Sequence, residues 1–541
     1  MHGYWVASAV PGCGVGALTD ESRRQAMSTA TTRTRTGLRR SRRTHPSAQG
    51  PFAVGRRARL PGRPSVSTGA AAAGLSALMV AGLAIRVAIP RGLWLDEAIS
   101  VEQAQLGLPE LIQDLAHTDR HPPLHHVLLW AIGRTVGDGD LAMRAPSIVA
   151  GVLLIAAVYW LGVEVYDRRT GLVAALLATL APILVWYSQE ARGYELEALF
   201  CTVAAVGCVR VIKRGSGWDW ALHTVAAALA VWTHWFAIFV VLATELAFLW
   251  ELRRRWRAPG QSAGRYAMRW ALATAALLAQ FVPLALLAAE QIRATGTAGG
   301  YAGATVDAEG MSFYTIVSNV AWAFFGFHPG VVTRILSAVW PLFMLAALLL
   351  LGRRVGRCSA VLLACALVPV AALLALAIHS PDVFDVRYFI VAVPPALVLL
   401  ARLALSWPAS AAARAVVVAA MAGTLAVALV DQQRNDHNPR RYDFREALAR
   451  AEERAGPRGV VLYEPDELRY VIARYAPTLV ARPIGRVAPS RKQARRVVVL
   501  GSFLEQERNR RATDRVVGAL KATRREGPTD RFPGVRLWSF Q

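Results

Sequence analysis

Carboxylates, arginines and aromatic residues stand beside the ends of several apolar segments in this sequence. Asp96 and Glu97 follow Trp94 and Leu95, a short distance after the first long apolar run. A carboxylate placed there can take the proton of a hydroxyl nucleophile, and arginine forks can hold a departing phosphate. The residues with suitable chemistry are Asp96, Glu97, Glu190, His121, His234, Arg144, Arg192, Arg387, Tyr194 and Tyr388. The set predicts a group transfer in which a hydroxyl attacks and a phosphate leaves.

These residues also have structural interpretations that compete with the catalytic one. Asp96 could be a solvated loop carboxylate. Arg192 and Arg387 could extend to lipid headgroups, as long cationic side chains near the ends of membrane helices do. His121 precedes two prolines, where a turn residue would stand, and His234 could cap a helix at the membrane surface. The elements that carry these residues must therefore be placed first.

The composition indicates that lipid is the solvent for most of the chain. Of its 541 residues 54% are apolar and only 18% are charged, too few to cover the surface of a soluble enzyme. The five cysteines form no CxxC pair and no Cys/His cluster, so neither a disulfide framework nor a zinc site is expected. The net charge of +24 comes from arginines spread over a tail, short loops and the C-terminal segment, which argues against a nucleic-acid partner.

The apolar runs predict an α-helical polytopic membrane protein with about eleven transmembrane helices. A helix needs about 20 residues to cross the hydrocarbon layer. The segments that meet this requirement are 69–89, 144–165, 171–187, 195–212, 218–233, 235–252, 270–290, 331–351, 360–378, 388–405 and 412–430. Leu124 to Val136 is too short and carries His125, His126 and Arg134, so we expect it to lie at the membrane surface. Residues 90–143 then form one long external loop.

Basic residues between the segments set the predicted orientation, because cytoplasmic loops are rich in lysine and arginine. The eleven-helix assignment places Arg168-Arg169, Lys213-Arg214, Arg253 to Arg257 and Arg353-Arg354 together in the cytoplasm. Counting Leu124 to Val136 as a crossing helix would move all of them outside. We therefore expect a plasma-membrane protein with a cytoplasmic N-terminus, and with Asp96 and the other candidate residues on the outer side.

Polar segments flank the predicted membrane domain of residues 69–430. Residues 1–68 are rich in arginine, serine, threonine and glycine and are expected to form a disordered, basic cytoplasmic tail, in which Met27 is a plausible start. Residues 431–541 predict a small extracytoplasmic α/β domain. Its expected elements are helices over 443–455 and 506–525 and strands over 460–463 and 496–500.

The order of the motifs resembles the dolichyl-phosphate-mannose protein mannosyltransferase superfamily, in particular its bacterial family 39-like glycosyltransferases. The matching motifs are Trp94-Leu95-Asp96-Glu97, His121-Pro122-Pro123-Leu124, Leu141 to Ser147, Tyr187 to Tyr194, and Arg387-Tyr388-Phe389 with Pro394. They span about Arg86 to Pro395 and are specific in combination, although each alone is weak. The tail and the C-terminal domain lie outside them.

This resemblance implies the C-type membrane glycosyltransferase fold and inverting transfer of a sugar from a polyprenyl phosphate. Asp96 would be the catalytic base, with Glu97 beside it, and the donor would be bound by His121, Arg144, Arg192, Tyr194, Arg387 and Tyr388, with Glu190 and His234 as further candidates. Related aminoarabinose transferases carry a lysine where this chain has His121, which leaves the donor contact there open. The sugar could be mannose or arabinose, and the acceptor a protein, a glycan or a lipid.

Two other functions compete with the enzyme, and a cofactor is left open. A lipid or sugar transporter would also be polytopic and basic, but such proteins commonly show internal repeats and ionisable residues near the middle of the membrane. The sequence shows neither. A catalytically inactive relative that only helps to assemble a cell-envelope complex is a further alternative. Glu97 could cap a helix, or join Asp96 in holding a divalent cation through oxygen ligands.

Overall fold

The computed structural model describes residues 66–119, 121–258, 263–295, 312–352, 356–379, 385–406, 409–484 and 496–541. Most of the predicted N-terminal tail lies outside these residues, as does the predicted cytoplasmic pair Arg353-Arg354.

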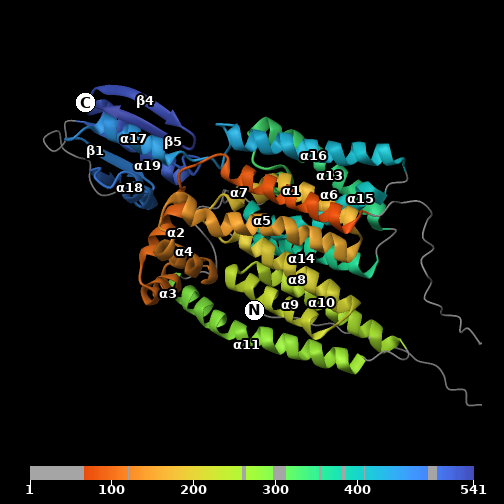
Figure 1. Ribbon diagram of the computed structural model, residues 1–541. Helices are drawn as coiled ribbons and strands as arrows, with labels where there is room; N and C mark the ends of the chain where they lie inside the picture. The colour runs from red at the N-terminus through yellow and green to blue at the C-terminus, as the bar shows by residue number, and fades with distance from the viewer. Residues whose placement is uncertain are drawn as a thin grey trace, which may run out of the picture. The chain divides into compact units, whose positions relative to one another are not determined.

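Helices occupy all eleven segments in which crossing helices were predicted, and Figure 1 shows the long ones running side by side. They are α1 (Thr68–Val87), α5 (Asp140–Val165), α6 (Arg168–Leu180) with α7 (Pro182–Ser188), α8 (Tyr194–Lys213), α9 (Gly217–Thr233), α10 (Ala237–Arg257), α11 (Ala263–Thr295), α13 (Gly330–Gly352), α14 (Arg357–His379), α15 (Val393–Ser406) and α16 (Ala411–Arg434). Among the described residues, six helices are long and apolar enough to cross a membrane, or up to eight if each of two bent pairs counts as one. The number eleven therefore stays a prediction.

Three predicted crossing helices, α8, α9 and α10, do not meet this criterion. Helix α9 has 17 residues, and α8 and α10 carry the fully buried carboxylates Glu195, Glu197 and Glu251. Most of α8 is buried, and it packs against α5 and α9. Protein therefore surrounds α8, which can hold charged groups that lipid would not accept, whereas α10 also presents exposed apolar residues such as Ile238 and Leu242.

Breaks in two helices shape the end of the bundle at which α7 lies. Helices α6 and α7 meet at 60° around Ala181, where Pro182 cannot continue the hydrogen-bond pattern of α6. Helix α12 (Phe313–Phe325), which the sequence did not predict, meets α13 at 94°. Gly326 between them has φ +81°, and a Cβ there would collide with Gln432 and Pro182, so only glycine fits this position.

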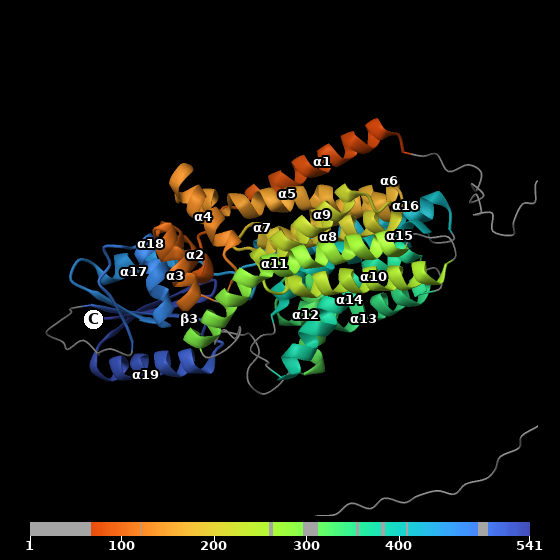
Figure 2. The same cartoon turned by 90° about the horizontal axis from the view of Figure 1, so that it is seen from below.

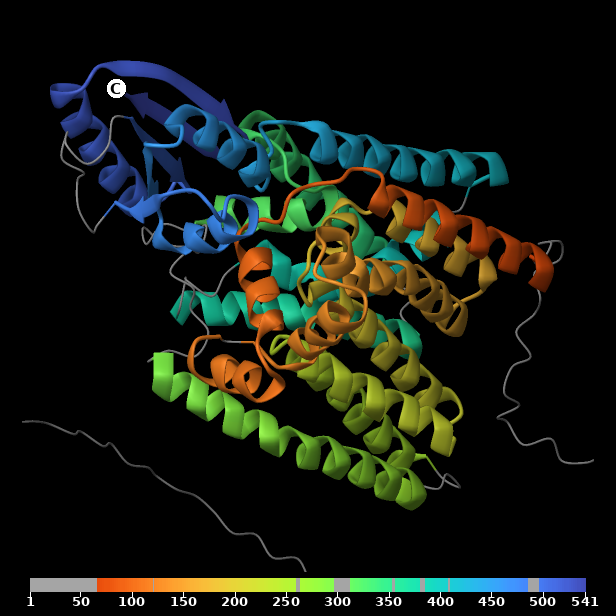
Figure 3. The same cartoon turned by 60° about the vertical axis from the view of Figure 1, so that its left-hand side comes forward.

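The first predicted external loop contains three short helices: α2 (Leu95–Gln105), α3 (Leu108–His117) and α4 (Leu124–Thr135). The 12-residue α4 is the segment that was too short to cross a membrane. Figure 2 shows α2, α3 and α4 at one end of the long helices, beside the C-terminal strands. Helix α11 extends past its predicted end at Glu290 and reaches α3, where Gln291 donates to the carbonyl of Leu115 at 2.9 Å (Figure 3).

The C-terminal segment folds into a five-stranded sheet with the order β2-β1-β3-β5-β4. Its strands are β1 (Val460–Glu464), β2 (Ala481–Pro483), β3 (Val497–Ser502), β4 (Glu526–Phe532) and β5 (Val535–Phe540). Strands β2, β1 and β3 are parallel, whereas β5 and β4 join as an antiparallel hairpin. Helices α17 (Phe444–Ala455) and α18 (Arg469–Tyr475) cover one face and α19 (Glu507–Thr523) covers the other.

The sequence predicted part of this sheet. Strands β1 and β3 and helices α17 and α19 lie where they were expected, because the two strands are continuous apolar runs buried on both faces. Strands β2 and β4 were not predicted, since neither shows such a run, and β5 was missed although it is mostly buried.

Candidate active site

Three segments far apart in the sequence meet at the end of the bundle formed by α2, α3 and α4. They are the first turn of α2, the connection from α7 to α8, and the 3-10 helix η2 (Val386–Ala392) before α15. They bring together Asp96 and Glu97, then Glu190, Arg192 and Tyr194, and finally Arg387 and Tyr388.

Asp96 forms an ion pair with Arg387, although the two residues are 291 positions apart in the sequence. Arg387 Nη1 donates to Asp96 Oδ2 at 3.2 Å, and the two side chains are 14% and 15% exposed. The same nitrogen donates to the hydroxyl of Tyr194 at 3.1 Å. The Asp96 carboxylate is thus held by a guanidinium while part of it stays accessible to a substrate.

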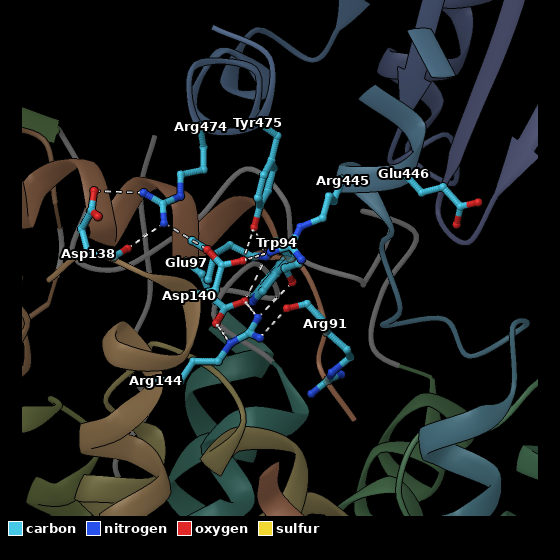
Figure 4. A network of polar contacts seen from close by, with 12 residues as sticks. Arg91, Trp94, Glu97, Asp138, Asp140, Arg144, Arg445, Glu446, Arg474 and Tyr475 are labelled. Atoms are coloured by element: carbon cyan, nitrogen blue, oxygen red, sulfur yellow. Dashed lines mark hydrogen bonds and ion pairs between the residues drawn. The ribbon is translucent and has the colours of Figure 1, made fainter. Parts of the chain in front are cut away.

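Glu97 has a different environment from its neighbour Asp96, and Figure 4 shows its contacts with Arg144. It is 1% exposed, and both its oxygens accept from Arg144, Nε to Oε1 at 2.7 Å and Nη2 to Oε2 at 2.6 Å. The backbone N–H of Ala191 donates to Oε1 at 2.7 Å, and that of Trp94 donates to Oε2 at 3.1 Å. Glu97 thus caps α2 and ties it to α5 and to the α7–α8 connection.

Arg144 therefore lies away from the Asp96 carboxylate. Besides Glu97, its guanidinium donates to the carbonyls of Arg91 at 2.7 Å and Gly92 at 2.9 Å. These contacts use Nε and both terminal nitrogens, and they position the start of the first loop. The contacts of Arg192 and Arg387 are different, because both guanidinium groups lie near the ring of Tyr194.

Arg192 forms a chain with His121 and Asp119. Its Nη1 donates to Ser100 Oγ at 2.9 Å, and its Nη2 donates to His121 Nε2 at 3.0 Å. His121 Nδ1 in turn lies 2.6 Å from Asp119 Oδ1. Burial, together with the charge of Arg192, lowers the pKa of His121 to about 4. Burial by itself would raise the pKa of Asp119, but the hydrogen bond with His121 and the charge of Arg192 help to hold it well below its usual value. His121 is therefore a neutral imidazole that orients Arg192.

Aromatic rings surround the two arginines. The carbon at the centre of each guanidinium lies close to the Tyr194 ring centroid, at 5.8 Å for Arg192 and 5.5 Å for Arg387. The ring of His234 lies 5.4 Å from both Tyr194 and Tyr388. The structure thus brings Tyr194, Tyr388 and His234 into the same site as the arginines.

Glu190 is a buried carboxylate beside this site. It is 4% exposed, and no hydrogen bond to its Oε2 is formed by the described part of the chain. Burial raises its pKa to about 7, and the charge of Glu97 adds to the effect, while Arg91 and Arg387 oppose it. Near neutral pH both the protonated and the ionised form of Glu190 are therefore populated.

Two residues of this site were not singled out from the sequence. Asp385 accepts from Arg387 Nη2 at 3.1 Å, and Arg440 Nη2 lies 3.0 Å from each oxygen of Asp385. Arg440 follows the last membrane helix in a segment rich in arginine, where no local pattern distinguishes it. Only the folded chain shows that it reaches the site.

The acidic pair does not fit a shared divalent cation. Asp96 faces Arg387 and Glu97 faces Arg144, so the two carboxylates point to different guanidinium groups. Within the described ranges, no group of three or more His, Cys, Asp or Glu side chains could hold a metal ion.

Comparison with known proteins gives the fold and a family match for one segment of the chain. Residues 120–286, which include His121, Arg144, Arg192, Tyr194 and His234, match the family model described as dolichyl-phosphate-mannose-protein mannosyltransferase. The curated proteins contain no match. Among solved structures, ArnT from Cupriavidus metallidurans is similar in its apo state, with a TM-score of 0.53, 12% identity, and coverage of 87% of this chain and 98% of ArnT.

A second ArnT structure, bound to undecaprenyl phosphate, gives a TM-score of 0.52, 12% identity, and coverage of 88% of this chain and 98% of ArnT. The similarity to ArnT shows the C-type membrane fold, and it extends over the C-terminal domain as well as the helices. The chain therefore has the C-type membrane glycosyltransferase fold, and its residues 120–286 match the dolichyl-phosphate-mannose-protein mannosyltransferase family model.

Proposed function

We propose that this glycosyltransferase moves a sugar from a polyprenyl phosphate to a hydroxyl of an extracytoplasmic acceptor, with Asp96 as the catalytic base. The main support for this proposal is the contact between Asp96 and Arg387, because it places a proton acceptor directly beside a group that can bind phosphate. No hydrogen bond from the described residues reaches Asp96 Oδ1, so this oxygen can accept the acceptor's proton.

The reaction is a single displacement at the anomeric carbon. The acceptor hydroxyl transfers its proton to Asp96 as its oxygen bonds to the anomeric carbon. The bond from that carbon to the phosphate oxygen breaks, its electron pair stays on the phosphate, and the configuration inverts. Negative charge grows on the leaving phosphate, so cations in a water-poor site stabilise the transition state more than the ground state.

Arg192 and Arg387 are suited to bind that phosphate. Both lie near the ring of Tyr194, and both are held in place by hydrogen bonds, Arg192 by Ser100 and His121, Arg387 by Asp96. A guanidinium fixed before the reaction needs little reorganisation when charge develops. Arg144, by contrast, is occupied by Glu97 and two carbonyls, and we assign it a positioning role.

The charge of the site favours an anionic donor. Besides Glu190, five guanidinium groups face four carboxylates, so one guanidinium is in excess for a phosphodiester while Glu190 is protonated. The guanidiniums belong to Arg91, Arg144, Arg192, Arg387 and Arg440, and the carboxylates to Asp96, Glu97, Asp119 and Asp385. The charged groups gather at one end of the bundle, which gives a transporter no support.

An extracytoplasmic active site in the plasma membrane agrees with the charges at the other end of the helices. Arg168 begins α6, Lys213 ends α8 and Arg257 ends α10, all at the ends away from α2. If those ends are cytoplasmic, the site and the C-terminal domain lie outside.

A transfer assay tests the proposal. Purified protein would receive radiolabelled polyprenyl-phosphate mannose or polyprenyl-phosphate arabinose together with membrane extract as the source of acceptor. We expect the wild type to incorporate label and Asp96→Asn to lose at least about a hundredfold, because the base is gone. Glu102→Gln, which removes an exposed carboxylate from the same helix, is the matched control and should retain activity. Retention of most activity by Asp96→Asn would overturn the assignment.

A further inference from the structure

The connection between the last membrane helix and the C-terminal domain reaches the active site through one side chain. This connection runs from the end of α16 at Arg434 to the start of α17 at Phe444. Within it, Arg440 places its guanidinium beside Asp385, 55 residues earlier in the chain, and the two side chains are 11% and 9% exposed. Neither residue belongs to the segment that matches the family.

Charges of opposite sign alternate from this connection to the base. Arg440 Nη2 lies 3.0 Å from both oxygens of Asp385, Asp385 Oδ2 accepts from Arg387 Nη2 at 3.1 Å, and Arg387 Nη1 donates to Asp96. Arg387 therefore serves two carboxylates. Asp385 also caps η2 by accepting from the backbone N–H of Arg387 at 3.1 Å.

We propose that Arg440 is a positioning residue for the catalytic base, acting through Asp385 and Arg387. The inference rests on the proposed role of Asp96. Arg440 neutralises Asp385, so that Arg387 keeps its charge for Asp96 and for the leaving phosphate. Without Arg440, Asp385 would draw Arg387 towards itself, because an unpaired buried carboxylate takes up the nearest cation.

The connection holds Arg440 rigidly enough for this role. Asn438 Nδ2 donates to the carbonyl of Gln432 at 2.7 Å, and its Oδ1 accepts from the backbone N–H of Arg440 at 2.9 Å. Two residues later, Tyr442 stacks on Trp94, with ring centroids 6.2 Å apart. Arg440 is thus fixed between the end of α16 and the residue before α2.

Activity of the full-length protein provides the first test, with the donor that the wild type accepts. Arg440→Gln should lower kcat by about 10- to 100-fold, the range expected for a lost charged hydrogen bond, and should change KM for the donor less. Arg440→Lys restores the charge, so its loss in log kcat should be smaller than that of Arg440→Gln by at least a third. Arg441→Gln is the matched control, since Arg441 is the next residue and pairs with Asp436 instead.

A double-mutant cycle separates charge balance from simple packing. Once Asp385→Asn has removed the competing carboxylate, Arg440→Gln should cost less than about threefold. Equal losses in both backgrounds, or a lysine variant as poor as the glutamine variant, would overturn the inference. If Asp96→Asn abolishes transfer while Arg440→Gln does not lower it, the proposed function stands and this inference fails.

Amide hydrogen exchange tests the positioning role without any substrate. Arg440→Gln should speed exchange in η2 and in the first turn of α2, whereas Arg441→Gln should not. Unchanged exchange in both segments would overturn the inference even if neither donor supports transfer. If Asp96→Asn retained transfer while exchange responded as expected, the proposed function would fail and the structural link would remain.

Discussion

Arg144 binds both carboxylate oxygens of Glu97 in a buried, two-pronged ion pair. Their side chains are 9% and 1% exposed. Arg144 also holds two carbonyls between α1 and α2, so one guanidinium fixes the segment that leads to Asp96. Adjacent carboxylates thus have separate tasks, Glu97 in the framework of the site and Asp96 at the reacting atoms.

Removing one partner of this pair should destabilise the protein strongly. Arg144→Met leaves Glu97 as a buried charge without its cation, which typically costs about 3–5 kcal/mol. We expect a large fall in the thermal unfolding temperature, measured in detergent. The double variant Glu97→Gln with Arg144→Met should lose less stability than the sum of the two single changes. Additive losses would show that the pair is not coupled.

Arg192 should not tolerate lysine, although the charge is the same. Its fork donates to Ser100 and His121 through separate nitrogens, and a lysine ammonium cannot reproduce both contacts in that geometry. We expect Arg192→Lys to lower kcat/KM for the donor by about tenfold or more, as for one charged hydrogen bond. The exposed Arg402, which pairs with Asp167, provides the control Arg402→Lys. A wild-type kcat/KM in Arg192→Lys would exclude Arg192 as a donor contact.

Glu190 should give the enzyme a loss of activity on the alkaline side. Its pKa is raised to about 7, so the site has a surplus positive charge below this pH and loses it above. Donor kcat/KM should therefore fall as the pH rises through about 7, and Glu190→Gln should flatten this limb. Unchanged pH profiles in the variant would contradict the assignment.

The same carboxyl group links protonation to stability. The folded protein keeps a proton on Glu190 between the ordinary value of 4.5 and about 7, whereas the unfolded chain has lost it. Stability from this group is therefore present at low pH and declines as the pH rises through that window. Glu190→Gln should weaken this dependence in thermal unfolding measured from pH 5 to pH 8.

The sequence predicted the elements that local composition determines. The short apolar run before Thr135 forms a separate helix, and the valine runs of β1 and β3 form buried strands. Asp96 and Arg387 were selected from the sequence as separate candidates. Their contact could not be predicted, because they are 291 positions apart and only the folded chain brings them together.

Other features had no local signal. Arg440 resembles its neighbour Arg441 in sequence, yet only Arg440 faces Asp385, because Asn438 turns the backbone between α16 and α17. Helix α12 was missed because its 13 residues are too few to cross a membrane, and because the following helix α13 is long enough on its own. Strand β4 has little apolar character and forms because it pairs with β5.

Tyr475 should couple the C-terminal domain to the catalytic helix. Its hydroxyl donates to Asp140 Oδ2 at 2.8 Å and accepts from the backbone N–H of Leu93 at 2.5 Å, and Arg474 and Arg445 also bind Asp140 (Figure 4). Tyr475→Phe removes both hydrogen bonds and leaves the N–H of Leu93 without this partner, at a cost of about 1–3 kcal/mol.

We expect faster amide hydrogen exchange in α2 of this variant and a kcat lowered by up to about tenfold, because each 1.4 kcal/mol lost from the transition state alone is tenfold in rate. Tyr470→Phe, on the same helix α18, is the control, since within the described chain the Tyr470 hydroxyl is hydrogen-bonded only to the exposed Arg469. If Tyr475→Phe changes neither exchange in α2 nor kcat, the domain is attached to the catalytic helix through its apolar contacts, such as Trp94 on Tyr442, and the hydrogen bonds are dispensable.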